Sequence, residues 1–427
     1  MYSDLLKQTI REVSEKLGAD SKAARLFANC YPNTLETTTK ALEDGRYFVF
    51  TGDIPAMWLR DSSAQVRHYL PLAKEHPEIA AMIEGLCRQQ TFCMLQDPYA
   101  NAFNETSNGH CYRHDQTDMI PLDWERKYEI DSLCYPIQLA YLLWKTTGRD
   151  GHLDAAFHQM LRTVTDLWIL EQHHENSPYR FVRTDCPPSD TLPLEGKGNP
   201  VVYTGMTWSG FRPSDDACLY GYLIPSNMFA VVVLKMGAQI AQDLFADKAL
   251  AFDMLRLREE IDQGIKEYGI IDHPRYGKMY AYEVDGHGGV NLMDDANVPS
   301  LLSIPYLGYT SWDDPVYQNT RRFILSEDNP YYYKGTALSG IGSPHTPKHY
   351  VWPIALCVEG LTTHDPAEAE RIMELLTSSD AGTGYMHEGV FKDDPSRFTR
   401  SWFAWANSIF SEFVLHYLKL KEKTCNL

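Results

Sequence analysis

An adjacent pair of aspartates is the feature of this sequence with the most specific chemistry. Asp215 and Asp216 lie in the run GFRPSDDA, close behind Arg212. A carboxylic acid donates a proton near neutral pH only when its pKa is raised, and a neighbouring carboxylate or a dry pocket can raise it. We therefore predict that one of the two is a general acid. The alternative is that one of them caps the segment that follows.

A single glutamate further along the chain has the chemistry of the complementary base. Glu388 lies in the run GYMHEGVF, a stretch with few other charges. An isolated glutamate is more often a solvated surface charge. In such a segment, however, a carboxylate can activate a water molecule on the face opposite the acid. Together with the aspartates, Glu388 indicates hydrolysis of a bond.

A third run combines an aromatic ring with two charged groups. Trp58, Arg60 and Asp61 end the run TGDIPAMWLRD. Guanidinium and carboxylate groups bind adjacent hydroxyls, and aromatic rings pack against the C–H faces of sugars. This combination predicts a carbohydrate site. The structural alternative is that Asp61 caps a helix that begins near Ser62, with Arg60 as its ion partner.

The segments that position these groups are mostly helical. Apolar residues recur three or four positions apart in many stretches, for example Ile130, Leu133, Ile137 and Tyr141, and this is the spacing of one helix face. Several predicted helices are apolar on more than one face, which is typical of helices between an outer layer and a packed centre. Strand-like segments are few and short, at residues 46–51, 179–183 and 279–284.

Long loops rich in Asp, Asn, His, Gly, Trp and Tyr join the helices, and long loops in a compact protein are usually functional. No fixed sequence period appears, which argues against a solenoid. We predict an all-α fold, a toroid of paired helices with a few short strands in its loops and the polar loops at one mouth. No linker or low-complexity stretch interrupts the chain, so residues 1–427 are expected to form a single catalytic domain.

The net charge of −18 restricts the possible partners. Nucleic acid needs a basic stripe and an anionic membrane attracts polybasic segments, so neither partner is expected. No apolar stretch approaches the length of a membrane span, and the first residues lack the basic and apolar regions of a secretion signal. The nine cysteines are scattered. These features predict a cytoplasmic protein, and they leave its oligomeric partners open.

The histidines do not suggest a metal site. His110, His114, His287 and His345 form no His-x-x-x-His pair and have no obvious carboxylate at ligand spacing. The acidic run at residues 293–297 lacks the spacing and the terminal glutamate of a calcium loop. No phosphate loop, dinucleotide fingerprint or nucleophile elbow occurs. We therefore expect no metal and no cofactor.

Four motifs taken together resemble glycoside hydrolase family 125. They are residues 51–62, 212–216, 293–300 and 387–389, and the order and spacing extend from about residue 20 to residue 415. The resemblance implies an (α/α)6 toroid that removes terminal α-1,6-linked mannose from the non-reducing end, with inversion and without a metal. It also implies that the acid lies in the aspartate pair, which we assign to Asp215, and that Glu388 is the base.

A pocket closed at one end would explain removal of terminal sugars. We expect Trp58, Arg60, Asp61, Asn297 and His345 to line it and to bind a mannose-containing oligosaccharide. Residue chemistry alone does not distinguish mannose from glucose. Another (α/α)6 carbohydrate-active enzyme (a glucosidase, a phosphorylase or a sugar epimerase) and a non-catalytic glycan-binding protein remain as alternatives. Inversion would require the two carboxyl groups to lie roughly 6.5–9.5 Å apart, which leaves room for a water molecule between the base and the sugar.

Overall fold

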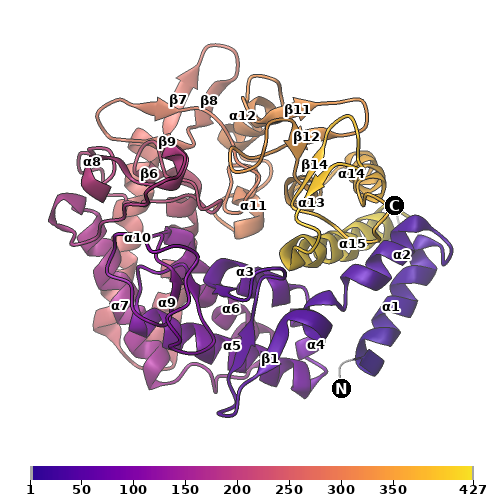
Figure 1. Cartoon of the computed structure of the whole chain (residues 1–427), viewed down its shortest axis with the longest axis horizontal. Coiled ribbons are helices and arrows are strands. Elements are labelled where there is room, and N and C mark those ends of the chain that lie inside the picture. Colours follow the sequence, from indigo (N-terminus) through magenta and orange to yellow (C-terminus); the bar gives the residue numbers. More distant parts are fainter. Residues whose placement is uncertain (1–2, 426–427) are drawn as a thin grey trace.

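The helices form two concentric layers, which Figure 1 shows down the shortest axis of the molecule. The structure is a computed structural model that describes residues 3–425. Within this range the inner layer consists of α3 (Leu59–Arg67), α6 (Ile130–Thr147), α9 (Ile224–Asp243), α11 (Ile304–Leu307), α13 (Pro353–Leu361) and α15 (Ala404–Cys425). The outer layer consists of α2 (Lys22–Cys30), α5 (Pro77–Gln96), α7 (Ala155–Glu171), α10 (Lys248–Tyr268), α12 (Pro315–Ile324) and α14 (Pro366–Ser378). The predicted (α/α)6 toroid is therefore confirmed.

The chain alternates between the two layers. Around the inner ring, α3 packs on α6, α6 on α9 and α9 on α11, and α15 closes the ring by packing on both α13 and α3. Outer helices pack on the ring from outside, as α5 does on α6, α10 on α9 and α14 on α13. Three of the α-helices that the structure describes lie outside this scheme: α1 (Ser3–Leu17), α4 (Leu70–Ala73) and α8 (Pro193–Gly196).

Hydrophobic patterning explains why each helix belongs to its layer. In α13 nearly every residue is apolar and buried, as expected of a helix with neighbours on all sides. In the outer helix α10 the buried residues form one stripe, at Leu250, Met254, Leu257, Ile261 and Ile265. Their spacing of three and four residues places them on one face, towards the inner ring.

One inner helix differs from the sequence-based expectation about membrane spans. By length and composition, α9 is apolar enough to cross a bilayer, and it is the one such helix among residues 3–425. Within its apolar window, 78% of the residues are buried inside the molecule. Its apolar faces are therefore used in packing against α6, α10 and α11.

Inner and outer helices begin in different ways. The side chains of Asp154, Asp247, Asp314 and Asp365 accept backbone N–H groups at the starts of the outer helices α7, α10, α12 and α14. These are N-caps. The inner helices α3, α9 and α13 begin directly after short strands or extended residues, and no side chain caps them. The positive ends of their dipoles are therefore available to stabilise negative charge.

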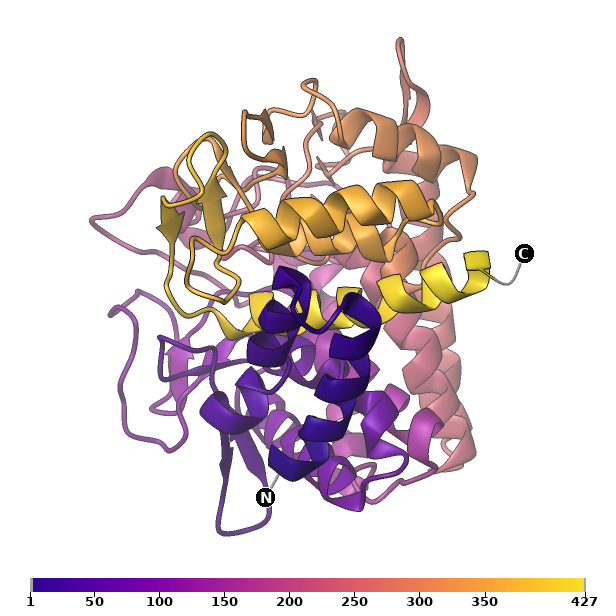
Figure 2. The same ribbon diagram turned by 90° about the vertical axis from the view of Figure 1, so that its right-hand side faces the viewer.

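Short antiparallel sheets occupy the loops, mainly before the inner helices. The three-stranded sheets are β3 (Met57–Trp58), β4 (Ala102–Phe103) and β5 (Asp123–Glu125); β6 (Tyr222–Leu223), β9 (Glu283–Val284) and β10 (Val290–Asn291); and β13 (Tyr350–Val351), β14 (Gly389–Phe391) and β15 (Phe398–Thr399). The two-stranded sheets are β1 (Thr39–Ala41) with β2 (Tyr47–Val49), β7 (Ile270–His273) with β8 (Gly277–Tyr280), and β11 (Tyr332–Lys334) with β12 (Ser339–Ile341). In Figure 2 many of the long loops lie beyond the N-terminal end of α15, on the left.

Two of the three predicted strand segments contain strands. Residues 46–51 contain β2, and residues 279–284 contain the end of β8 and all of β9. The prediction for residues 179–183 is wrong. Val182 makes one isolated bridge with Gln116, whereas the amide of Phe181 donates to the carbonyl of Gly196. The backbone of this segment is divided between two partners, so no continuous ladder forms.

Candidate active site

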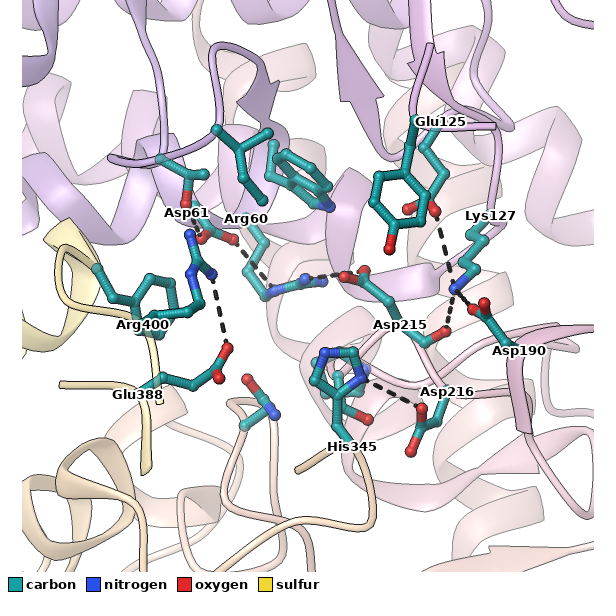
Figure 3. Close-up of a pocket in the computed structure, with 18 of the residues that line it drawn as sticks. Arg60, Asp61, Glu125, Lys127, Asp190, Asp215, Asp216, His345, Glu388 and Arg400 are labelled. Atoms are coloured by element: carbon teal, nitrogen blue, oxygen red, sulfur yellow. Dashed lines mark hydrogen bonds and ion pairs between the residues drawn. The ribbon is translucent and has the colours of Figure 1, made fainter. Parts of the chain in front are cut away.

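A cavity of about 350 Å³ lies where the inner helices begin, within the range of about 300–1,000 Å³ that is typical of small-molecule sites. All seven predicted site residues line it: Trp58, Arg60, Asp61, Asp215, Asn297, His345 and Glu388. Figure 3 shows Asp215 and Glu388 on opposite sides of this cavity. Segments far apart in the sequence thus meet at one site, while the role of each residue stays a prediction.

Asp215 lies at the tip of a tight turn. Its amide donates to the carbonyl of Arg212, and the amide of Arg212 donates to the carbonyl of Asp216. The turn places Asp215 at φ 67°, a left-handed conformation that is uncommon for residues other than glycine and is enriched at functional sites. The side chain is 21% exposed and accepts hydrogen bonds from Arg60 (3.3 Å) and Asn101 (3.2 Å).

The helix that carries Arg60 and Asp61 begins earlier than the sequence suggested. It starts at Leu59 rather than near Ser62, so both charged residues lie in the first turn of α3. Asp61 is therefore not an N-cap. Its carboxylate accepts a hydrogen bond of 2.7 Å from the Thr51 hydroxyl and faces the cavity. Burial raises the pKa of Asp61, although the charge of Arg60 opposes this effect.

Arg60 is the centre of a buried charge cluster. Its guanidinium lies 2.6 Å from Glu129, 3.2 Å from Asp131, 3.3 Å from Asp215 and 3.5 Å from Asp61. The side chains of Glu129 and Asp131 are fully buried at the start of α6. A guanidinium binds planar carboxylates through several N–H groups at once, which makes it suited to this position.

The pKa of Asp215 is shifted in the direction opposite to the prediction. Burial disfavours its charged form, but the positive charges of Arg60 and Lys127 outweigh burial and hold the pKa of Asp215 well below its usual range. The raised pKa belongs to Glu129, because this group is fully buried and lies beside the charges of Asp215 and Asp131. The carboxyl group whose surroundings favour its protonated form is thus Glu129 and not the predicted acid.

Asp216 faces a different partner from Asp215. Its Oδ1 lies 3.3 Å from Nδ1 of His345, and its side chain is only 6% exposed. Burial would lower the pKa of His345, yet the hydrogen bond and charge of Asp216 raise it to about 9. A pKa of about 9 favours the charged imidazolium form of His345 near neutral pH. His345 lies on the cavity wall between Asp216 and Glu388 (Figure 3).

Glu388 forms the other side of the cavity with far fewer contacts. It directly precedes β14, and Oε1 lies 3.6 Å from Nη1 of Arg400. Asp53 holds the Arg400 guanidinium in turn, with Nε 3.1 Å from Oδ1 and a second hydrogen bond from Nη2. Among the described residues no group donates a hydrogen bond to the Glu388 carboxylate. Its oxygens are free to bind a water molecule.

A glycine joins the two chain segments of this wall. Gly52 forms an isolated bridge with Phe403 and adopts φ 131°. A Cβ at this position would lie 2.7 Å from the carbonyl oxygen of Trp402. Only glycine combines this conformation with so close an approach. The amide of Asp53 donates to the same carbonyl, so the Arg400 partner is fixed by the same junction.

The remaining predicted residues lie on the walls. Trp58 is 6% exposed, and its indole Nε1 is buried without a hydrogen-bond partner in the described part of the chain. The Nδ2 of Asn297 lies 3.3 Å from Asp295. An aromatic wall from Trp352, Phe403 and Trp405 extends the apolar part of the cavity. Apolar faces beside amide and charged groups suit a sugar ring.

A second charged cluster, absent from the sequence prediction, lines the cavity on the side of Asp215. Arg183 lies 2.7 Å from Asp115, 2.8 Å from Glu125 and 2.9 Å from Asp190. The Nζ of Lys127 donates a hydrogen bond of 2.7 Å to the carbonyl of Asp215. The cluster therefore fixes the turn that carries the predicted acid.

Sequence reasoning missed several residues that the structure places at the site: Asn101, Tyr112, Glu125, Lys127, Glu129, Asp131, Arg183, Asp190 and Arg400. A signal for part of this set exists in the run WERKYEID, where charged residues stand directly before the apolar stripe of α6. Charges at the start of a buried helix need partners. That pattern could have directed attention to Lys127, Glu129 and Asp131.

Comparison with known proteins gives consistent matches. A family model described as metal-independent alpha-mannosidase (GH125) matches residues 20–415. A metal-independent alpha mannosidase from Streptococcus pneumoniae, in a non-productive complex with alpha-1,6-mannobiose, is 50% identical, with a TM-score of 0.96 over 97% of this chain and 98% of that chain. The meiotically up-regulated gene 157 protein of Schizosaccharomyces pombe is 41% identical over 98% of this chain and 87% of that protein. A more distant glycosidase structure, 12% identical with a TM-score of 0.59, shares the fold.

The toroid and the cavity at the starts of its inner helices have the form of a carbohydrate-active enzyme, and the matches show that the class is that of the glycoside hydrolases. The chain belongs to family GH125, the metal-independent α-mannosidases. The predicted family, enzyme class and fold are confirmed by these matches. Among residues 3–425 no group of three or more His, Cys, Asp or Glu side chains is arranged to hold a metal ion.

Proposed function

We propose that this α-mannosidase removes terminal α-1,6-linked mannose from the non-reducing end of oligosaccharides, with inversion. The observation that carries the proposal is the pair of carboxyl groups on opposite sides of one cavity, Asp215 and Glu388 (Figure 3). Support for the linkage comes from the α-1,6-mannobiose held by the 50% identical Streptococcus pneumoniae protein. A mannose-containing oligosaccharide is accordingly the proposed substrate.

The mechanism assigns one step to each carboxyl group. Asp215 protonates the glycosidic oxygen, and Glu388 takes a proton from the water that attacks C1 from the opposite face. The contrast between the two aspartates favours Asp215 as the acid, because Asp216 is paired with His345 and is less exposed. The oxygens of Glu388 line the cavity and accept no hydrogen bond from the described residues, which suits a group that must bind water.

Removal of terminal residues fits the gradient of exposure along the cavity. Arg60 and Asp61, with side chains 4% and 7% exposed, form the deep part. Tyr112 on the rim is 53% exposed. We assign the deep part, with Trp58, Arg60, Asp61 and Asn297, to the terminal mannose, and the rim to the rest of the glycan, with His345, whose side chain is 38% exposed, on the wall between them. Because the pocket ends in buried charged groups, it admits the terminal sugar of a glycan and leaves no room for a further sugar beyond it.

NMR time courses of hydrolysis test the proposal, with α-1,6-mannobiose, its α-1,2- and α-1,3-linked isomers and a longer α-1,6-mannan as substrates. The expected first product signal is β-mannose, which then equilibrates with the α anomer. Initial release of α-mannose would contradict inversion. Faster cleavage of α-1,2- or α-1,3-mannobiose would contradict the linkage, and cleavage inside a longer α-1,6-mannan would contradict removal of terminal residues.

A further inference from the structure

The charge cluster around Arg60 contains more carboxyl groups than one cation can neutralise. Asp61, Glu129, Asp131 and Asp215 all lie within 3.5 Å of its guanidinium. If all four were ionised, the cluster would carry three net negative charges in a nearly dry environment. Isolated buried charge of this kind is costly, so such groups bind protons instead.

Glu129 has the position of the group that carries such a proton. Its side chain is 0% exposed, and Oε2 accepts hydrogen bonds from Arg60 and from the hydroxyl of Ser132. The other oxygen, Oε1, is buried and receives no hydrogen bond from any described residue. The carboxyl groups of Glu129 and Asp215 bind the same guanidinium, through Nη1 and Nη2 of Arg60, and each shifts the pKa of the other. Two carboxyl groups in such contact are more stable when they share one proton than when both are ionised.

The groups that face this pair come from four parts of the chain. Arg60 and Asp61 belong to α3, Asp131 and Ser132 to α6, Asn101 and Lys127 to the loops beside β4 and β5, and His345 to the loop before β13. Cations lie mainly on the Asp215 side, where Lys127 and His345 favour its charged form. The pKa of Glu129 is raised, first by burial and then by the charges of Asp215 and Asp131, against the charge of Arg60.

We propose that Glu129 is a positioning residue that stores the proton of the catalytic acid and passes it to Asp215. The proposal rests on the proposed function. In the transfer the Glu129 carboxyl becomes a carboxylate and Asp215 becomes a carboxylic acid. Asp215 then gives this proton to the glycosidic oxygen as the C1–O bond breaks, while Glu388 takes one from water. Release of that proton to solvent and uptake of one by the pair restore the starting state.

The geometry allows the negative charge to reside on either member of the pair. Arg60 lies 2.6 Å from Glu129 and 3.3 Å from Asp215, so a Glu129 carboxylate has the closer cation. A bound sugar would cover the exposed 21% of the Asp215 side chain. Loss of that water disfavours the Asp215 anion and moves the proton towards Asp215. Binding of the substrate thus promotes protonation of Asp215.

The test compares substrates that do and do not need an acid. Glu129→Gln keeps the shape and the hydrogen bonds of the neutral group but cannot give up a proton. On α-1,6-mannobiose, kcat/KM should fall about 100-fold, within the range for loss of general acid catalysis. On 2,4-dinitrophenyl α-mannoside, whose leaving group departs unprotonated, it should fall less than about tenfold. Mannobiose activity of the variant should recover towards acidic pH, where solvent protonates Asp215 directly.

Two further variants separate this role from a structural one. Asp131→Asn neutralises another carboxylate on Arg60, and its effect should be equal on both substrates. Asp215→Asn should show the same substrate dependence as Glu129→Gln, without acid recovery. Equal losses on both substrates for Glu129→Gln, with an unchanged pH profile, would overturn the storage role. If Asp215→Asn also showed no substrate dependence, the proposed function itself would fail.

The wild-type enzyme gives a measurement that needs no variant to fold. If Asp215 held its own proton, its lowered pKa would make mannobiose activity fall about tenfold per pH unit above the acidic range. A pair that shares one stored proton should keep kcat/KM for mannobiose level up to near-neutral pH. A continuous decline from about pH 4 upward would overturn the proposal.

Discussion

The two sides of the cavity hold their carboxyl groups in opposite ways. Asp215 is part of a dense network in which Arg60, Asn101 and Lys127 contact its side chain or carbonyl. Glu388 has one ion-pair partner within the described range, Arg400 at 3.6 Å. The contrast matches the proposed division of work, because an acid needs a controlled supply of protons whereas a base needs open oxygens for water.

The two sides also differ in how burial is compensated. On the Asp215 side, the side chains of Arg60, Glu129 and Asp131 are 4%, 0% and 0% exposed and pair with one another, so removal of one partner leaves another buried and unpaired. On the Glu388 side, Arg400 and Asp53 are 21% and 35% exposed, and water can replace a lost contact. Substitutions on the Asp215 side should therefore affect both stability and catalysis, and those on the Glu388 side mainly catalysis.

The largest expected effect comes from removal of the two carboxylates themselves. Glu388→Gln should lower kcat by about 10²–10⁴-fold on every mannoside, because attack by water is needed for each of them. Asp215→Asn should lower it as much on α-1,6-mannobiose but far less on 2,4-dinitrophenyl α-mannoside. Steady-state rates on the two substrates measure the difference, with Asp216→Asn as the neighbouring control. Near-wild-type turnover of both variants on mannobiose would disprove the pair.

A smaller effect is expected for the arginine beside the base. Arg400→Lys keeps the charge but loses the two-point contact with Asp53 that aims the guanidinium at Glu388. We expect kcat to fall about tenfold, with thermal stability nearly unchanged. Arg397→Lys is the matched control, because Arg397 packs on Phe391 in the same segment but does not line the cavity. Lys127→Met, on the Asp215 side, should lower the thermal stability more than Arg400→Lys does. A larger loss of stability for Arg400→Lys would contradict the expected difference between the two sides of the cavity.

A pH effect on stability is expected at His345. Its pKa of about 9 in the folded protein lies above the value of about 6.5 for an unfolded histidine. The stabilisation is therefore complete below about pH 6.5 and disappears as the pH rises through 9. His345→Gln should reduce Tm at pH 6 and not at pH 9.5, as differential scanning fluorimetry across this range would show. A difference in Tm that grows with pH would contradict the ion pair with Asp216.

The smallest expected effect is that of metal removal. On neither side of the cavity are three such side chains arranged to hold a metal ion, as far as residues 3–425 are concerned, and the family is described as metal-independent. Dialysis against EDTA should leave kcat/KM on mannobiose unchanged. Activity that fell and then returned with an added divalent cation would show that the carboxylates of one side bind metal.

The fold was predictable because helical periodicity is local. Stripes such as those of α6 and α10 depend on residues three and four positions apart, so a single sequence contains them. The predicted strand at residues 179–183 failed for the opposite reason, because strand pairing depends on distant partners. The start of α3 was misplaced by three residues, because the helix was expected to begin near Ser62 whereas β3 leads directly into it at Leu59.

The cavity residues were predictable in part for the same reason. Unusual runs identified Trp58, Asp215 and Glu388 as members of one site. The protonation of the acid was not predictable, because Arg60 lies 155 positions from Asp215 and Lys127 lies 88 positions from it. Local sequence contains the neighbouring Asp216, whereas the group that holds the proton is Glu129, which only the folded chain brings near.

The junction at Gly52 has a consequence for the order in which the enzyme is made. It joins a loop near the beginning of the chain to residues just before α15, and Glu388 and Arg400 lie in that late segment. A nascent chain that has left the ribosome as far as α13 has every predicted acid-side residue and lacks the base. Hydrolytic activity therefore requires the late segment that holds Glu388 and Arg400 to dock against the early loop at Gly52.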